Sequence, residues 1–209
     1  SPPSLFVTSN GDIYIADVSN NGQVQKWIST TNKFITVMNV KSSCTGLFVD
    51  ITDNLYCSMD NHHQVVKRSL NDSVMTQIIV AGTGIKGSNS NQLSDPFGIF
   101  VDVNLDLYVA DCANARVQLF QLGNSNGITV AGSQSPNPTI SLSCPTYIVL
   151  DDEKYLFIVD FGNDRIVRSG VNGFRCLVGC YGRGSQSNEL FYPVTLSFDR
   201  SGDMFVTDR

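Results

Sequence analysis

The stretch LYVADCANARVQLF at residues 107–120 decides the fold, because imperfect copies of it occur elsewhere in the chain. IYIADVSNNGQVQKW occupies residues 13–27, LFIVDFGNDRIVRS residues 156–169, and a shortened MFVTDR residues 204–209. One apolar run carries little information alone. Recurrence at a near-constant interval indicates a repeat architecture, in which every unit is one supersecondary element.

Three more runs accompany each copy. The preceding run is SLFVT, TGLFVD, FGIFVD, TYIVLD or VTLSFD, and it recurs every 42 to 52 residues, with its apolar part ending at Val7, Val49, Val101, Leu150 and Phe198. Polar segments such as SNGD and ITDN join these runs to the copies, and their Asn, Asp and Gly residues tolerate the positive φ of a tight reversal. A third run such as RVQLFQ and a fourth such as GITVAG follow in four units. Each complete unit is therefore predicted to be four short antiparallel strands.

The inner runs are apolar at nearly every position, so both faces of each small sheet must be covered. A ring of sheets packed face to face provides this cover, whereas a two-layer sandwich would leave one face polar. We therefore predict an all-β, β-propeller fold in one domain spanning residues 1–209. Four complete blades and half of a fifth are expected, at approximately 1–42, 43–94, 95–143, 144–191 and 192–209.

The unit beginning Pro96-Phe97-Gly98, followed by LDLYVAD, Asn114-Ala115-Arg116-Val117 and ITVAG, resembles the NHL-repeat propeller family. Its pattern is Pro-x-Gly, two strands that each end in Asp, and Asn-His-Arg-Ile or a variant. Pro2, Pro145 and Pro193 align with Pro96, Cys44 stands at that place in unit two, and Gln23 and Gln64 replace the arginine. The resemblance implies about six blades. We therefore expect a fragment, or a second copy that covers the open ends.

Acidic residues end the first strands (Asp50, Asp102, Asp151, Asp199) and the second strands (Asp17, Asp111, Asp160, Asp208). A catalytic carboxylate has no reason to recur in every blade, so we interpret these residues as turn caps, with Arg116 and Arg165 paired to nearby carboxylates. Calcium in the central channel is the alternative interpretation. No catalytic or metal-binding residue and no other cofactor is assigned, because His62 and His63 are adjacent and would point to opposite faces of a strand.

Topology suggests partners for the six cysteines. Cys112 follows a second strand and Cys144 enters the next blade on the same side of the disc, so these two are candidates for an inter-blade disulfide. Cys176 and Cys180 are too far apart along a regular strand, and they pair only if Gly179 lets the strand bulge. Cys57 aligns with apolar strand residues and is expected to be a buried thiol.

Three functions are considered. The first is a non-enzymatic module that binds protein or glycan through its long connectors, with Lys86, Tyr181 and Arg183 as contacts. The second is RNA binding, as in related propellers, which the net charge of −5 disfavours. The third is a metal-dependent hydrolase or lyase on the propeller axis.

The setting of the chain is expected to be extracellular, with a cytoplasmic one as the alternative. Asn71-Asp72-Ser73 is an N-glycosylation sequon in a predicted turn, and six cysteines are present. No run is long enough to span a membrane, and the N-terminal SPPSLFVTSNGD does not have the pattern of a signal peptide. The basic pair Lys67-Arg68 is interpreted as a solvated strand edge.

Overall fold

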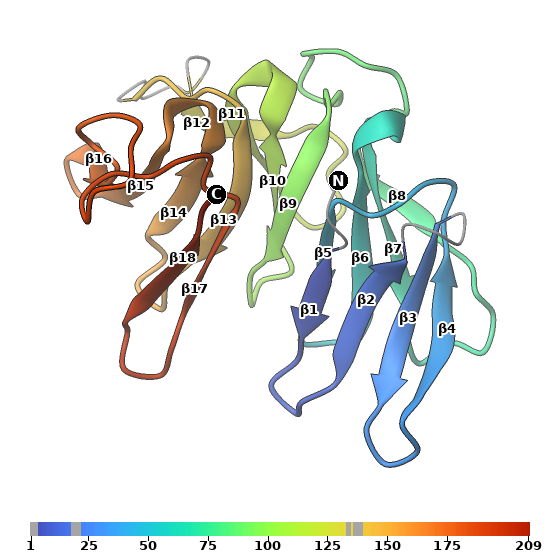
Figure 1. Cartoon of the computed structure of the whole chain (residues 1–209). Helices are drawn as coiled ribbons and strands as arrows, with labels where there is room; N and C mark the ends of the chain where they lie inside the picture. The colour runs from blue at the N-terminus through green and yellow to red at the C-terminus, as the bar shows by residue number, and fades with distance from the viewer. Residues whose placement is uncertain (1–3, 18–21, 133–134, 136–139) are drawn as a thin grey trace.

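The computed structural model describes residues 4–17, 22–132, 135 and 140–209. Pro2 and residues 133–134 and 136–139 of the connector between units three and four lie outside these residues. The described chain forms four four-stranded antiparallel sheets and one two-stranded sheet, each with its strands in sequence order (Figure 1). Blade 1 contains β1 (Leu5–Val7), β2 (Ile13–Asp17), β3 (Gln23–Ile28) and β4 (Lys33–Asn39). Blade 2 contains β5 (Gly46–Val49), β6 (Asn54–Met59), β7 (Gln64–Ser69) and β8 (Ile78–Ala81), and blade 3 contains β9 (Pro96–Val101), β10 (Leu107–Asp111), β11 (Arg116–Phe120) and β12 (Ile128–Gly132). Blade 4 contains β13 (Pro145–Leu150), β14 (Leu156–Asp160), β15 (Arg165–Gly170) and β16 (Gly173–Val178), and blade 5 contains β17 (Thr195–Phe198) and β18 (Met204–Thr207).

The blades follow one another around an arc, with the first strands of successive blades adjacent. Four apolar clusters fill the spaces between neighbouring blades, so each sheet is covered by its neighbours. Strand β14 is buried along its whole length, which explains why its sequence LFIVD shows no alternation of polar and apolar residues. The prediction of propeller blades, four complete and one of two strands, is confirmed.

The turns between first and second strands are capped by the recurring aspartates, as expected. In blade 2 the Asp50 Oδ1 atom accepts hydrogen bonds from the backbone N–H groups of Thr52 and Asn54, at 2.8 and 3.0 Å. Blades 3 to 5 repeat this cap with Asp102, Asp151 and Asp199. The positive φ of the turn falls on Leu105 in blade 3 and on Lys154 in blade 4, so hydrogen bonding from the cap fixes the turn even where no Gly or Asn is available.

A 3-10 helix separates the second strand from the third in blades 2, 3 and 4: η1 (Asp60–His62), η2 (Cys112–Asn114) and η3 (Phe161–Asn163). Each helix ends at a residue in the left-handed region, namely His63, Ala115 and Asp164. The expectation that His62 and His63 alternate across a strand is therefore wrong. Both histidines lie in this turn, where the chain reverses before β7.

Two sheet faces are open at the ends of the arc. The face of blade 1 that points away from blade 2 carries Leu5, Val7 and Phe34, whose exposed fractions are 57%, 51% and 53%. These residues align across the strands with Ile13, Ile15 and Trp27. On blade 5, Phe205 is 58% exposed. The equivalent faces inside the arc are closed by the next blade.

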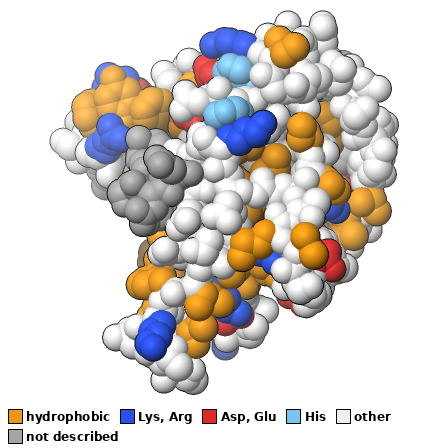
Figure 2. Space-filling model, turned by 90° about the vertical axis from the view of Figure 1, so that its right-hand side faces the viewer, with side chains coloured by type: hydrophobic (Ala, Val, Ile, Leu, Met, Phe, Trp, Pro, Cys, Tyr) orange, Lys and Arg blue, Asp and Glu red, His pale blue; other side chains and the backbone are white. Residues whose placement is uncertain are grey.

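The side of the arc around blades 1 and 2 carries apolar side chains over its lower part (Figure 2). Histidine side chains lie in the upper part of this view, beside cationic and acidic side chains. In the described part of the chain, no helix is long and apolar enough to cross a membrane.

Candidate functional site: the connector face

Connectors between blades lie on the edge of the arc where the 3-10 helices lie, opposite the short hairpin turns (Figure 1). The connector that enters blade 3 is fixed by a buried arginine of that blade. Arg116 is 2% exposed, and its Nε donates to Asp111 Oδ2 at 2.7 Å. Its two Nη atoms donate to the carbonyls of three connector residues at 2.8 to 3.2 Å: Ser88, Asn89 and Gln92. This arginine therefore binds its own strand and the loop that precedes it.

The other members of the repeat motif complete this arrangement. Asp111 Oδ1 accepts the backbone N–H of Ser94 at 2.6 Å, and Asn114 donates both to Asp111 and to the Gly87 carbonyl, at 2.8 and 2.9 Å. Burial raises the pKa of Asp111, against the opposing effect of hydrogen bonds from Asn114, Ser94 and Arg116. The expectation that Arg116 pairs with a nearby carboxylate is confirmed.

Blade 4 repeats the motif in a more exposed form. Arg165 pairs with Asp160 at 2.9 Å, but 22% of its side chain is exposed. Its Nη2 donates to the Ser141 carbonyl at 2.6 Å, and Asp160 accepts the Ser143 backbone N–H at 2.6 Å. The Asp–Asn–Arg motif is thus a clamp for the incoming connector, which assigns it a structural function.

Two of the connectors are built alike. GTGIKGSNSNQLSDP at residues 82–96 aligns with GCYGRGSQSNELFYP at residues 179–193 without a gap. In each, the second shared Gly donates its N–H to the shared Leu carbonyl at 3.2 Å, Gly87 to Leu93 and Gly184 to Leu190. The similarity of these two connectors is present in the sequence, but the pattern of strands does not indicate it because the connectors lie outside the strands.

Each connector ends at a joint, which we define as the contact between the last residue before the new blade and the turn of the preceding blade. The joint residues are Asp95, Cys144 and Tyr192, with φ values of 53°, 52° and 50°. Three chemistries close the three joints. The Asp95 N–H donates to His63 Nδ1 at 3.2 Å, Cys144 is bonded to Cys112, and the Tyr192 N–H donates to Asp164 Oδ1 at 2.8 Å.

Lys86 and Arg183, two of the three predicted contacts, occupy equivalent positions in the aligned connectors, and both are used within joints. Lys86 Nζ lies 3.2 Å from Asp95 Oδ2. Arg183 Nε donates to Asp164 Oδ2 at 2.8 Å, and its guanidinium lies 4.0 Å from the centroid of the Tyr192 ring. The Asp164 carboxylate raises the pKa of Arg183, chiefly through this hydrogen bond.

Tyr181, the third predicted contact, is 82% exposed on the same connector as Arg183. Phe161 stacks on Tyr192 at 5.0 Å between ring centroids, and Phe191 meets Tyr192 edge-on at 4.8 Å. This aromatic group between blades 4 and 5 was not identified from the sequence. Lys86 lies on the connector between blades 2 and 3, so the structure does not place it in the same group.

The structure pairs all six cysteines. Cys112 is joined to Cys144 across blades 3 and 4, as the topology suggested. Cys176 is joined to Cys180, with Gly179 at φ 73° and a register shift between β15 and β16. Cys57 is not a thiol, because it is joined to Cys44. The alignment of Cys57 with apolar strand residues could not show that the loop before β5 brings the Cys44 sulfur to the Cys57 sulfur.

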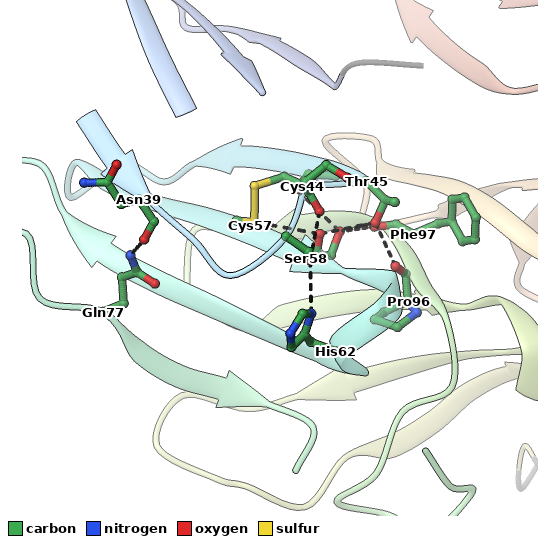
Figure 3. The surroundings of a disulfide bond; sticks show 12 residues. Asn39, Cys44, Thr45, Cys57, Ser58, His62, Gln77, Pro96 and Phe97 are labelled. Atoms are coloured by element: carbon green, nitrogen blue, oxygen red, sulfur yellow. Dashed lines mark hydrogen bonds between the residues drawn. A yellow bond between two sulfur atoms is a disulfide. The ribbon is translucent and has the colours of Figure 1, made fainter. Parts of the chain in front are cut away.

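Figure 3 shows the Cys44–Cys57 disulfide beside a polar contact between blades 2 and 3. Thr45 Oγ1 donates to the Pro96 carbonyl at 2.9 Å, and Ser58 Oγ donates to the Phe97 carbonyl. His62 Nδ1 is within hydrogen-bond distance of Ser42 Oγ, 3.1 Å. This region joins the entrance of blade 2 to blade 3.

Carboxylates on the hairpin edge are likewise engaged in structure. Tyr56 donates its hydroxyl to Asp50 Oδ2 at 2.9 Å. Burial alone would raise the pKa of Asp50, but hydrogen bonds from Asn54 and Thr52 outweigh it and lower the pKa. Burial raises the pKa of Tyr56, and the Asp50 charge adds to the effect. No three His, Cys, Asp or Glu side chains converge as a metal site in the part of the chain that the structure describes.

Comparison with known proteins agrees with the fold. The NHL-repeat family model matches residues 3–27. No curated protein matches the chain. Solved structures that cover 99% of the chain include a streptogramin B lyase (14% identity, TM-score 0.68), a structural genomics protein of unknown function from Bacteroides thetaiotaomicron (14%, 0.77) and a nidogen/laminin complex (16%, 0.73).

These likenesses define the class of protein. The chain spans 62%, 56% and 71% of the three matched chains. At such identities the likeness concerns the fold alone. The resemblance to NHL-repeat propellers is confirmed by the family match in the first unit and by the propeller neighbours. The chain is therefore an all-β protein of propeller blades with an NHL repeat.

Proposed function

We propose that this chain is a non-enzymatic interaction module that binds a protein or a glycan through its connector face. The supporting observation is the clamp at Arg116, which fixes three carbonyls of a long loop on a rigid sheet. Loops held in this way bind a partner without a large ordering cost. One structural neighbour is a nidogen/laminin complex, an assembly of two proteins.

Tyr181 is the residue of the connector face that is best placed to contact a partner. Lys86 and Arg183 are held by joint residues, so their charges are partly satisfied before any partner binds. Tyr181 is 82% exposed, and an aromatic ring offers a large contact area at a low entropic cost.

A binding screen with matched variants tests this proposal. The protein is immobilised and screened against extracellular-matrix proteins and a glycan array. Tyr181→Ser is expected to weaken any specific binding about tenfold or more, as for the loss of an aromatic anchor. Val171→Ser serves as the control, because Val171 is 87% exposed in the turn between β15 and β16. A larger effect of Val171→Ser would place recognition on the hairpin edge and contradict the proposal.

We further propose that the open sheet faces are covered in the functional protein, by further blades or by a second copy. The exposed Leu5, Val7 and Phe34 form an apolar face of the kind that is buried between blades inside the arc. Native mass spectrometry of the 209-residue chain is expected to show self-association. A stable monomer that binds no apolar dye would contradict this.

An extracellular setting belongs to the same proposal, supported by the three disulfides. Asn71 is exposed in the turn after β7, on the edge opposite the connectors. A glycan there would leave the connector face free. Expression through a eukaryotic secretory pathway is expected to give a glycosidase-sensitive mass increase that Asn71→Gln removes.

A further inference from the structure

A groove lies between blades 2 and 3 at the hairpin edge, away from the connector face. Its volume is about 270 Å³. Ile78 of β8, the cross-strand partner of Lys67, forms one wall, and Leu122 of the turn after β11 also lines the groove; their exposed fractions are 54% and 59%. Leu107 and Phe120 line it further in, where they are almost fully buried. The groove thus offers an apolar slot for a small molecule.

Lys67 is a half-buried cation in this slot, with its Nζ 5.7 Å from the centroid of the Tyr56 ring. Blades 1 and 4 have a cation at the same position of the third strand, opposite the equivalent ring. There the cation has an acidic partner: Lys26 pairs with Asp12 at 2.6 Å and Arg168 with Asp151 at 3.3 Å.

Blade 2 differs because both acidic partners are unavailable to Lys67. Asn54 stands at the position of Asp12. Asp50, at the position of Asp151, accepts hydrogen bonds from the Tyr56 hydroxyl and the Asn54 amide, each at 2.9 Å. Among the described residues no carboxylate forms an ion pair with Lys67, and no acidic residue lines the groove. A partly desolvated cation without a counter-charge favours an anionic ligand.

We propose that this groove binds a small amphipathic carboxylate, a molecule with a short alkyl chain and one anionic head. The carboxylate pairs with Lys67, and the chain lies between Ile78 and Leu122, above Leu107 and Phe120. Asn124 and Ser125 also line the groove, and their polar groups suit the hydrated end of such a ligand.

The equivalent groove between blades 3 and 4 is an internal control. Its volume is about 620 Å³, and the described residues that line it include Ile128, Val130 and Phe174, polar residues such as Thr129 and Ser169, and no ionisable one. Leu119 of blade 3 stands where blade 2 has Lys67. This second groove has apolar walls without a cation, so it provides no reason to prefer an anion over a neutral alcohol of the same length.

The probes are octanoate and 1-octanol, titrated into the protein and followed by calorimetry and by amide NMR shifts. Octanoate is expected to shift signals of β8 and the turn at 121–125, and to bind at least about tenfold more tightly than 1-octanol. Lys67→Met keeps the apolar stem and is expected to abolish this preference. Lys33→Met, an exposed lysine of blade 1, makes the same change of net charge and is expected to leave binding unaltered.

Asn54→Asp is a second variant, which supplies the acid that blade 1 has as Asp12. Because it also removes the amide that donates to Asp50 Oδ2, Asn54→Ala is measured beside it to separate the loss of this bond from the added charge. Asn54→Asp is expected to neutralise Lys67 and weaken octanoate binding several-fold without removing any apolar wall. Thermal unfolding of each variant verifies that it is folded. Equal binding of octanoate and 1-octanol, octanoate binding that is unchanged in Lys67→Met, or no binding at millimolar concentration would each overturn the proposal.

Discussion

The joint between blades 3 and 4 and the joint between blades 4 and 5 have nearly the same backbone but different chemistry. Cys144 and Tyr192 have φ values of 52° and 50°. In the first joint a disulfide binds Cys144 to Cys112. In the second joint, Tyr192 stacks between Phe161 and Arg183 and its N–H binds Asp164. One backbone arrangement is therefore held covalently in one place and by stacking and charge in another.

The comparison shows which part of a joint the architecture determines. The position of the connector is set by the sheet and by the aspartate that ends the second strand of the incoming blade, since Asp160 accepts the backbone N–H of Ser143 at 2.6 Å and Asp208 accepts that of Phe191 at 3.3 Å. The side chains at the joint then stabilise a connector whose backbone position is already set. Variants of clamps and joints separate these two contributions.

The clamp is expected to contribute most. Arg116→Met leaves Asp111 buried without its cation and removes three bonds to connector carbonyls, so about 3–5 kcal/mol of unfolding free energy is expected to be lost. Arg165→Met, the same change at the more exposed clamp of blade 4, is expected to cost about 1–3 kcal/mol. Urea unfolding measures both, and equal losses would show that burial of the clamp does not matter.

The covalent joint is expected to come next. Replacing Cys112 and Cys144 by Ser opens a loop between residues 32 apart, which corresponds to about 3–4 kcal/mol of chain entropy. The same replacement of Cys176 and Cys180, only 4 apart, is expected to cost about 2 kcal/mol. If the two double variants melt alike, the inter-blade position of the first disulfide adds nothing.

The hairpin edge, which lacks joints, provides a pH-dependent test. The pKa of Asp50 is lower in the folded protein than the ordinary value. The ionised carboxylate therefore stabilises the fold at pH values above the pKa that Asp50 has in the unfolded chain. As the pH falls through the lower pKa of the folded protein, the carboxylate is protonated and this stabilisation is lost. Asp50→Asn is expected to cost about 1–3 kcal/mol at neutral pH and less below about pH 4. The exposed Asp199 caps the equivalent turn of blade 5, so Asp199→Asn is the control at neutral pH, with a smaller loss of stability because the cap is exposed.

The smallest effect is expected at the stacked joint. Arg183→Lys keeps the charge but loses the planar stack on Tyr192, so only a small loss of stability is expected. The reverse change, Lys86→Arg, meets Asp95 instead of a ring and is expected to leave stability within about 0.5 kcal/mol. Differential scanning calorimetry of both variants resolves the difference, and a larger loss in Lys86→Arg would contradict the assignment.

Much of the fold could be predicted because each blade repeats one strand pattern. The fully apolar LFIVD run could only be covered on both sides, and it is buried along its length. The caps at Asp50 and its equivalents could also be predicted, because the hydrogen bonds of such a turn join residues that are close in sequence. The pairing of Arg116 was also accessible, because Asp111 and Arg116 are direct partners across one hairpin.

Contacts between distant segments could not be predicted in this way. Cys57 aligns with Ile15 and Val109, and only the path of the loop before β5 brings Cys44 to it. Arg68 was interpreted as part of a solvated edge, but it is 7% exposed and donates to the Val37 carbonyl of blade 1 and, at 2.8 Å, to the Asp72 carbonyl. Val37 lies 31 residues from Arg68 and Cys44 lies 13 residues from Cys57, so neither contact belongs to a local pattern.

The sequence by itself determined the strands, their order, the capped turns and the division into blades, because hydrophobic periodicity and turn chemistry act over a few neighbouring residues. Only the tertiary structure decided that Cys57 pairs with Cys44, which charges are satisfied and which, like Lys67, have no acidic partner. These outcomes depend on distances between side chains of separate strands and loops, and such distances are fixed only when the chain has folded into packed sheets.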